Sequence, residues 1–306
     1  MITTILYKAK EPFWVSYKKF IGRRTLRIFP LYYAVVLILF LLNHNVVTQY
    51  IFNFLTYTYN YAWVKYQIPD NSASHFWSLS VEEQFYLFWP FIVLLLRKNA
   101  NILIAVISIL IVGCFAQMTF SLLDVLNPYN ITGLVPRAGS LCMGALGAIL
   151  LIEKKLPIKL LENKLIEFAV MLLLVLCLIT ENSFKYSLLA LCSITLVLKA
   201  VTTNFKINVI NNFLLNKYII YIGSISYGIY IIHFPLGEYI TRHIFNPYIW
   251  EKINFSKLGK LSFLQYNSWL LKFPVYTLIS VALAHLSFKY FEQPILTLKD
   301  KFFKYS

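Results

Sequence analysis

The chain has 306 residues, of which 59% are hydrophobic and 13% are charged, and its mean hydropathy is +0.65. Soluble domains carry about a quarter charged residues, so this composition excludes a disordered chain, a disulfide-stapled secreted miniprotein and a soluble enzyme. We expect an all-α fold, a polytopic integral membrane helical bundle. The formal net charge of +15 is then better explained by membrane topology than by a nucleic-acid partner.

Membrane-spanning helices need about 20 mostly apolar residues each. Eight segments fit this description: 28–44, 76–96, 102–121, 133–152, 165–181, 186–203, 213–235 and 269–291. The stretch 46–63 is apolar but interrupted by polar residues and rich in aromatic ones, so we expect an interfacial or re-entrant segment there. The four cysteines (Cys114, Cys142, Cys177, Cys192) lie inside apolar runs without a CxxC spacing. This predicts small apolar side chains in lipid-buried helices, not disulfides or zinc ligands.

The distribution of Lys and Arg predicts an orientation. Twenty of the 28 fall on the side that carries both termini, seven fall on the opposite side, and Arg137 lies within a span. By the positive-inside rule, both termini are then cytoplasmic. We expect a single membrane domain over 1–306, with a basic cytoplasmic entrance at 1–27 and the longest external loop at 236–268.

The basic entrance contains Arg23, Arg24 and Arg27. Arg24 and Arg27 are three residues apart and share a helix face, with Arg23 beside them. Such a cluster at the inner membrane surface can bind a phosphorylated ligand. The alternative is that these charges only retain the amino end in the cytoplasm.

A dense polar group opens the second predicted span. Helical spacing places His75, Ser78 and Glu82 along one face, while Glu83 points about a hundred degrees away. A histidine beside a carboxylate is a general-base arrangement. The alternative is a histidine at the outer headgroup level and a glutamate that ties two helices together.

Three further features involve polar residues within spans or at their ends. Ser226, Tyr230 and His233 share a face that Pro235 follows, which suits either a site or a packing seam. Arg137 lies in a helix of small residues and needs a carboxylate or a phosphate, with Glu82, Glu83 or a ligand as candidates. Glu292 and Pro294 mark a broken helix end, which alone is a weak signal.

Other chemistries lack a motif in this sequence. It contains no Gly-rich phosphate loop, GxSxG elbow, HExxH or metal-spaced His/Cys set. Nucleotide hydrolysis and metal chemistry are therefore poorly supported. We also find no internal repeat of the kind that indicates a transporter built from two halves.

Five motifs, taken in order, resemble the membrane acyltransferase 3 family, which includes bacterial O-antigen, peptidoglycan and capsule O-acetyltransferases. The most specific is His75-x-Trp77-Ser78-Leu79-x-Val81-Glu82-x-Gln84-Phe85-Tyr86, ending at Pro90. The others are Arg23-Arg24-x-x-Arg27-Ile28-x-Pro30-x-Tyr32, Arg137 in its Gly/Ala helix, Gly223-x-Ile225-Ser226-Tyr227-x-x-Tyr230-x-x-His233-x-Pro235, and Glu292-x-Pro294. The resemblance covers nearly the whole chain.

This resemblance implies an enzyme of the bacterial cytoplasmic (inner) membrane that needs no metal. It would move an acyl group, usually acetyl, from acyl-CoA to a hydroxyl of a cell-surface polysaccharide or lipid-linked glycan. Arg23, Arg24 and Arg27 would face the CoA phosphates. His75, Ser78 and Glu82 would lie nearer the acceptor as candidate catalytic residues. Four further residues are implied in the site: Arg137, Tyr230, His233 and Glu292.

The amino end departs from the family pattern. Members usually begin with two further spans, the first of which carries an arginine and a histidine central to catalysis, and residues 1–11 resemble the tail of the second. The open explanations are a start further upstream, a separate complementing fragment, or an inactive product. Two alternative functions also stay open: a non-catalytic transporter or partner subunit for a lipid-linked glycan, and an inactive truncated relic.

Overall fold

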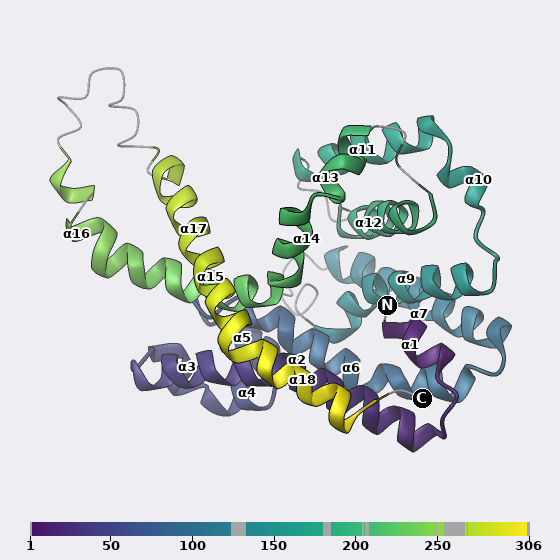
Figure 1. The fold of residues 1–306 in the computed structure, drawn as a ribbon, viewed down its shortest axis with the longest axis horizontal. Helices are drawn as coiled ribbons and strands as arrows, with labels where there is room; N and C mark the ends of the chain where they lie inside the picture. Colours follow the sequence, from purple (N-terminus) through teal and green to yellow (C-terminus); the bar gives the residue numbers. More distant parts are fainter. Residues whose placement is uncertain are drawn as a thin grey trace.

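The computed structural model describes residues 2–123, 133–179, 185–203, 205, 208–248, 250–253, 267 and 269–304. These residues are mostly helical and contain no strand, which confirms the all-α prediction (Figure 1). The helices of the first half are α1 (Ile2–Lys8), α2 (Phe13–Leu41), α3 (Asn45–Gln49), α4 (Ile51–Leu55), α5 (Tyr59–Lys65), α6 (Phe76–Leu96), α7 (Ala100–Leu123) and α9 (Leu134–Ile152).

The second half has more breaks. Its helices are α10 (Ile158–Leu161), α11 (Lys164–Ile179), α12 (Lys185–Thr202), α13 (Asn208–Leu214), α14 (Lys217–Ser224), α15 (Ser226–Ile240), η1 (Thr241–Phe245), α16 (Asn246–Tyr248), η2 (Trp250–Lys252), α17 (Trp269–Ser287), η4 (Phe288–Glu292) and α18 (Gln293–Phe302). The turns η1 and η4 are π-helical. Such turns occur often where a helix has to re-aim its side chains.

The eight predicted spans are largely helical in the described residues, although 42–44 lie beyond α2 and the seventh is divided among α13, α14 and α15. The count of eight stays a prediction. Three helices there are long and apolar enough to cross a membrane: Phe13–Leu41, Phe76–Leu96 and Ala100–Gln117. The pair Lys217–Ser224 and Ser226–Lys252 would make a fourth if the 67° bend between them lies within one span. Shorter apolar helices cover Arg137–Ile152 and Ser187–Thr202. Residues 180–181 of the predicted fifth span lie outside the described residues.

The centre of the molecule is the packing of α2 on α6. Each helix contains a proline, Pro30 and Pro90, and neither helix ends there. Membrane helices tolerate proline because neighbouring groups satisfy the freed carbonyl. Trp89 of α6 is buried, and its indole N–H donates to the Thr3 hydroxyl at 3.0 Å, which fastens α1 to the bundle.

The segment predicted to be interfacial or re-entrant forms three short helices, α3 to α5, that fold back beside α2 and α6 (Figure 1). The buried Tyr32 of α2 donates to the Phe54 carbonyl at 3.0 Å and stacks on Tyr57 at 4.6 Å between ring centroids. Gln84 of α6 donates to the Tyr57 carbonyl at 2.7 Å. These contacts hold the connection between α2 and α6 against both helices.

Two further groups of helices flank this centre. On one side α7 packs on α9, and α12 packs on α9 and α11 (Figure 1). On the other side α15 pairs with α17, and α18 returns to lie along α2. Residues 236–248 of the predicted external loop 236–268 are helical and continue α15, while 254–266 lie outside the described residues.

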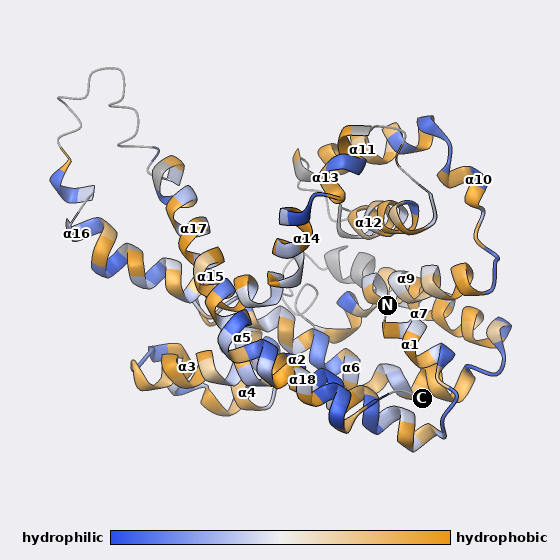
Figure 2. Ribbon diagram, viewed as in Figure 1, coloured by the Kyte–Doolittle hydropathy of each residue, from blue (hydrophilic) through white to orange (hydrophobic). Residues whose placement is uncertain are grey.

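The outward faces of the helices are strongly apolar. Figure 2 shows hydrophobic residues along α7, α9 and α17 and hydrophilic ones on α18. Many large apolar side chains are exposed, among them Leu37, Ile38, Ile109, Val112 and Leu165. An exposed apolar surface of this extent is costly in water and suits contact with lipid, so the predicted membrane class agrees with the structure.

Candidate functional site

The first turn of α6 is bonded directly to α15. The Tyr230 hydroxyl donates to the His75 carbonyl at 2.5 Å, and the Ser78 Oγ lies 2.6 Å from the same hydroxyl. Because Tyr230 gives its only proton to the carbonyl, Ser78 is the donor of the second bond. Two motifs whose bonded residues are 152 positions apart in the sequence therefore meet in one cluster.

His75 occupies an unusual position in this cluster. Its ring lies 5.2 Å from the Tyr230 ring and 5.3 Å from the His233 ring, between centroids. Both ring nitrogens are buried, and within the described residues neither has a hydrogen-bond partner. Backbone groups of Ile231, Ser72 and Tyr230 nevertheless lie close to the ring. Pro235 has no N–H to bond to the Ile231 carbonyl, which leaves this carbonyl available to His75.

Among the residues that the structure describes, no bond forms between His75 and Glu82, the carboxylate on the same helix face. Glu82 accepts a hydrogen bond from the Tyr86 hydroxyl at 3.0 Å, and no hydrogen bond or ion pair links His75 to Glu82 in the described part of the chain. Seven helical residues rise about 10 Å, which is beyond the reach of a histidine and a glutamate on the same helix. Helical spacing correctly places His75 and Glu82 on one face of α6, but it does not bring their side chains into contact.

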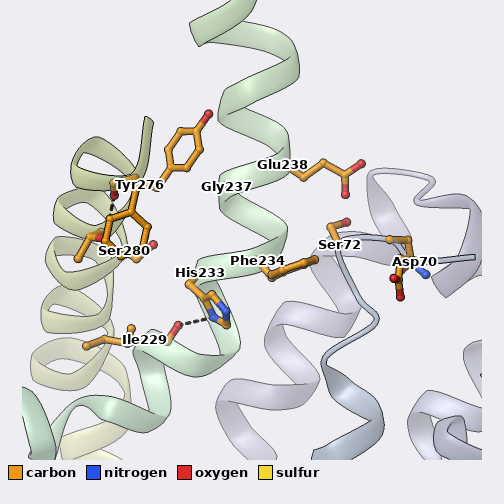
Figure 3. Close-up of a pocket in the computed structure, with 12 residues that line it drawn as sticks. Asp70, Ser72, Ile229, His233, Phe234, Gly237, Glu238, Tyr276 and Ser280 are labelled. Carbon is orange, nitrogen blue, oxygen red and sulfur yellow. Dashed lines mark hydrogen bonds between the residues drawn. The ribbon is translucent and has the colours of Figure 1, made fainter. Parts of the chain in front are cut away.

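His233 belongs to this cluster and also lines a cavity of 640 Å³ between segment 70–72, α15 and α17 (Figure 3). Its Nδ1 lies 2.8 Å from the Tyr230 carbonyl and 3.2 Å from the Ile229 carbonyl. A carbonyl only accepts, so Nδ1 carries the proton. In the neutral ring Nε2 is then unprotonated and able to accept a proton. This makes His233 the residue of the cluster best suited to act as a base on a ligand in the cavity.

The three arginines of the basic entrance contact three different elements. Arg23 donates to the Asp300 carboxylate at 2.8 Å and to the Phe303 carbonyl at 3.1 Å, so it stabilises the carboxyl end of α18. Arg27 interacts electrostatically with the buried Glu292 of η4. Arg24 faces α6. The three therefore do not form the single cluster that their spacing suggested.

Arg24 lines a cavity of 170 Å³ between α2, α6 and the 56–57 turn. Its guanidinium lies 3.6 Å from the centroid of the Tyr86 ring and interacts electrostatically with Glu83. Four polar atoms at this cavity are buried without a hydrogen-bond partner in the described residues: Arg24 Nε, Tyr57 OH, Glu83 Oε1 and Gln84 Oε1. Each such atom costs about 1–3 kcal/mol, so their convergence indicates a polar ligand or ordered water.

Glu292 is held on the far side of α2. Its Oε1 accepts from the Ser287 hydroxyl at 2.9 Å and lies 3.2 Å from where a Cβ on Gly228 would stand. Tyr227, next to that glycine, donates to the Ile28 carbonyl at 2.6 Å. The last motif is thereby packed against α2 and α15 at the level of the arginines.

Arg137 lies apart from both cavities. Its guanidinium is 5.2 Å from the centroid of the Trp77 ring, which stacks on Trp63 at 6.1 Å. It also lines a cavity of 610 Å³ between α1, α6, α9 and α12, together with Ser140 and Ser193. The structure thus places Arg137 beside the α6 motif but on its opposite flank from His233.

Comparison with known proteins identifies the family. The acyltransferase domain of the acyltransferase 3 family matches residues 5–288. The chain belongs to this family. The resemblance to acyltransferase 3 is therefore confirmed, and the roles of the individual motif residues stay predictions.

Two relatives of this acyltransferase 3 chain carry informative names. YrhL of Bacillus subtilis (strain 168), named as a peptidoglycan O-acetyltransferase, is 26% identical over 237 residues, which are 72% of this chain and 34% of that protein. ORF330 of Acidianus two-tailed virus, named as an acetyltransferase, is 31% identical over 228 residues, 72% of this chain and 66% of that protein. The aligned part thus spans about a third of YrhL and about two thirds of ORF330. No solved structure matches the chain.

Sequence reasoning missed two parts of the site. Glu83, not Glu82, faces Arg24, which only the packing of α2 on α6 decides. His44, counted as the end of a span, instead begins α3 and bonds Ser72 through Nε2 at 2.8 Å. Burial lowers the pKa of His44 below its usual value and keeps it neutral. The signal available was the polar Asn-His-Asn run at 43–45, which suits a helix end better than a span.

Proposed function

We propose that this chain is an O-acetyltransferase that moves an acetyl group from acyl-CoA to a hydroxyl of a cell-surface polysaccharide or lipid-linked glycan. The observation that carries the proposal is the set of buried, unpartnered polar atoms in a chain of the acyltransferase 3 family. One group surrounds Arg24 and Glu83, and another is the His75 ring. The names of both relatives support acetyl as the transferred group, and the name of YrhL supports a glycan as the acceptor.

The donor would bind at the cytoplasmic end. The distribution of Lys and Arg supports placing the start of α2 and both termini on the cytoplasmic side of the membrane, which we take to be a bacterial inner membrane. There Arg24, which lines the cavity, would attract the CoA phosphates, and Arg27 and Arg23 would join it on release from Glu292 and Asp300. The unpartnered atoms around the 170 Å³ cavity include donors and acceptors. This mixture suits the amide groups of a pantetheine arm.

The acceptor would approach from the cavity beside His233. Its hydroxyl oxygen would attack the thioester carbonyl carbon, forming the new C–O ester bond as the C–S bond breaks. Nε2 of His233 would take the hydroxyl proton, because Nδ1 is held by the Tyr230 carbonyl. The CoA thiolate leaves and takes up that proton. Ser78, Tyr230 and His75 would fix the ring of His233 in place.

The test uses the purified chain in lipid nanodiscs with radiolabelled acetyl-CoA and cell-envelope glycan. We expect label to enter the glycan as an alkali-labile ester. His233→Ala should reduce this transfer about 100-fold or more, the usual range for a lost general base, while acetyl-CoA binding is retained. A folded chain that binds acetyl-CoA but never esterifies glycan would refute the proposal and favour a transporter or partner subunit.

A further inference from the structure

Two cavities lie on either side of segment 70–72, which forms the wall between them. The first, of 640 Å³, lies toward α17 and contains His233. The second, of 510 Å³, lies between the end of α2 and α15 and is lined by His44 and Arg242. Asn71, Ser72 and Glu238 line both. Each volume lies in the range of about 300–1,000 Å³ typical of ligand pockets.

The wall between the cavities is rigid. Asn71 donates from its side chain to the Pro69 carbonyl at 2.9 Å and accepts from the Ala73 N–H at 2.9 Å. Its own N–H donates to the Ser74 hydroxyl at 2.8 Å. These local bonds fix the backbone of 69–74, so the polar groups of the wall are held in position before a ligand arrives.

Ser72 presents a hydroxyl proton from this wall. The His44 Nδ1 accepts from the Val47 N–H at 3.4 Å, so in the neutral ring Nε2 carries the proton and donates to Ser72 Oγ at 2.8 Å. Ser72 is therefore an acceptor in that bond, and its own proton remains to be donated. The side chain is 3% exposed, which keeps this geometry free of bulk water.

The charges around the wall favour an uncharged ligand. The Glu238 carboxylate is bonded to Arg242 at 2.5 Å, and Asp70 adds a second carboxylate at the rim. A phosphate in the 640 Å³ cavity would meet these acids unfavourably, whereas the linking phosphate of a lipid-linked glycan would lie near Arg242, which lines the second cavity. Carboxylates accept hydrogen bonds from adjacent hydroxyls, and the rings of Phe234 and Tyr276 offer flat faces to the C–H side of a sugar (Figure 3).

We propose that these two cavities form one binding site for neutral sugar residues of the acceptor. The site lies at the end of α2 opposite Arg24, about 26 Å away along the helix axis. It rests on the proposed function, because a sugar bound here would present a hydroxyl to His233. The residues that line the wall lie outside the five family motifs.

The sugar can come from a free polysaccharide or from a lipid-linked glycan. An apolar groove of 520 Å³ between α2, α15 and α17 joins the second cavity, since Leu39, Leu42, Pro235 and Tyr239 line both. A lipid-linked glycan would occupy the groove as well as the cavities, whereas a free chain would occupy the cavities alone.

The first experiment fills the cavity from a position with room for a side chain. Gly237 lines the 640 Å³ cavity, and a Cβ there would meet only the Tyr276 ring at 3.9 Å. We expect the native chain in nanodiscs to bind neutral bacterial glycans more tightly than acidic ones, and Gly237→Leu to weaken the neutral binding about tenfold or more. Affinity for acetyl-CoA should stay unchanged. The matched control is Gly113→Leu on α7, where nothing lies within 4 Å of the added carbon.

Binding and transfer are measured separately. Glycan binding that is lost in Gly237→Leu supports the site even if no acetyl group is transferred, in which case only the proposed function fails. Transfer that proceeds with an unchanged acceptor KM in Gly237→Leu overturns the site and leaves the function standing. Absence of neutral glycan binding by the native chain also overturns the site.

A second pair of variants distinguishes the sources of the sugar. Ile38 lines the groove and Leu37 does not, and the two are 54% and 56% exposed on the same helix. If the acceptor is lipid-linked, Ile38→Trp raises the KM of a polyprenyl-linked glycan and Leu37→Trp does not. If the acceptor is the free chain, neither variant changes its KM. Gly237→Leu should weaken both forms of acceptor, and if it spares both the site is wrong.

Discussion

Individual buried polar atoms give the strongest indication of where substrates bind. Within the described residues, both His75 nitrogens and the four atoms around Arg24 and Glu83 are buried without partners. Burying them in a chain that is otherwise so apolar is costly unless a ligand or ordered water pairs with them. They lie at two levels of α6, around His75 and around Glu83, which are about 12 Å apart along the helix axis.

Tyr230 is the residue on which the His75 cluster depends. In Tyr230→Phe, the His75 carbonyl and the Ser78 hydroxyl lose their bonds to it, so we expect a loss of about 1–3 kcal/mol in stability. Thermal unfolding in detergent measures the loss. In the same experiment Ser78→Ala should cost less when combined with Tyr230→Phe than alone, because the bond it removes is already gone. Equal costs in both backgrounds would mean that the two hydroxyls act independently.

At the scale of helices, the close approach of α15 to α17 and η4 depends on Gly228. A Cβ there would lie 3.2 Å from Glu292 Oε1 and 3.3 Å from the Ala284 Cβ. Gly228→Ala should therefore push α15 away from η4, disturb Glu292 and lower stability by about 1–3 kcal/mol. Gly223→Ala, with nothing within 4 Å, is the control. An unfolding temperature that drops equally in both variants would contradict the packing argument.

The sequence predicted helices better than it predicted contacts between them. Apolar runs located most of the helices, and motif order indicated α6 and α15 as the elements of the candidate site. Helical periodicity states which residues share a face, but it does not state what the face meets. His75 and Glu82 share a face of α6, yet Tyr230 bonds the first turn of α6 while Glu82 bonds Tyr86. Arg24 and Arg27 likewise reach different elements.

The site also depends on a segment with weak periodicity. The short helices α3 to α5 bring Tyr57 to the 170 Å³ cavity, and the loop after them brings Ser72 to the acceptor cavities. The chain turns at Asn43, Tyr57 and Gln67, each with a positive φ of 47–54°. Left-handed backbone at a tyrosine or glutamine has no sequence signature, since these residues rarely adopt it. The sequence predicted an interfacial or re-entrant segment at 46–63, but it did not predict where the chain turns or that Tyr57 and Ser72 would reach these cavities.

At the scale of the whole molecule, the helices α10 to α12 form a side group that is fastened by one buried ion pair. Lys199 of α12 lies 3.1 Å from Glu167 of α11, and its ammonium also donates to the Leu161 carbonyl of α10 at 2.5 Å. Both side chains are 2% exposed. This buried charge pair joins three helices whose other side chains are mostly apolar. Apolar contacts alone fix the relative position of helices poorly in lipid, so the pair would set how these three helices fit together.

Removing one partner of this pair should loosen the whole group of helices. Lys199→Met leaves the Glu167 carboxylate buried without its cation, which costs about 3–5 kcal/mol. We expect protease sensitivity between α10 and α12 in nanodiscs to rise strongly, while glycan binding at the opposite flank persists. Glu167→Gln combined with Lys199→Met removes both charges and should recover much of the loss. Lys217→Met, at an exposed lysine of α14, is the control. If the double variant is as sensitive as Lys199→Met, lost packing rather than an unpaired charge explains the effect.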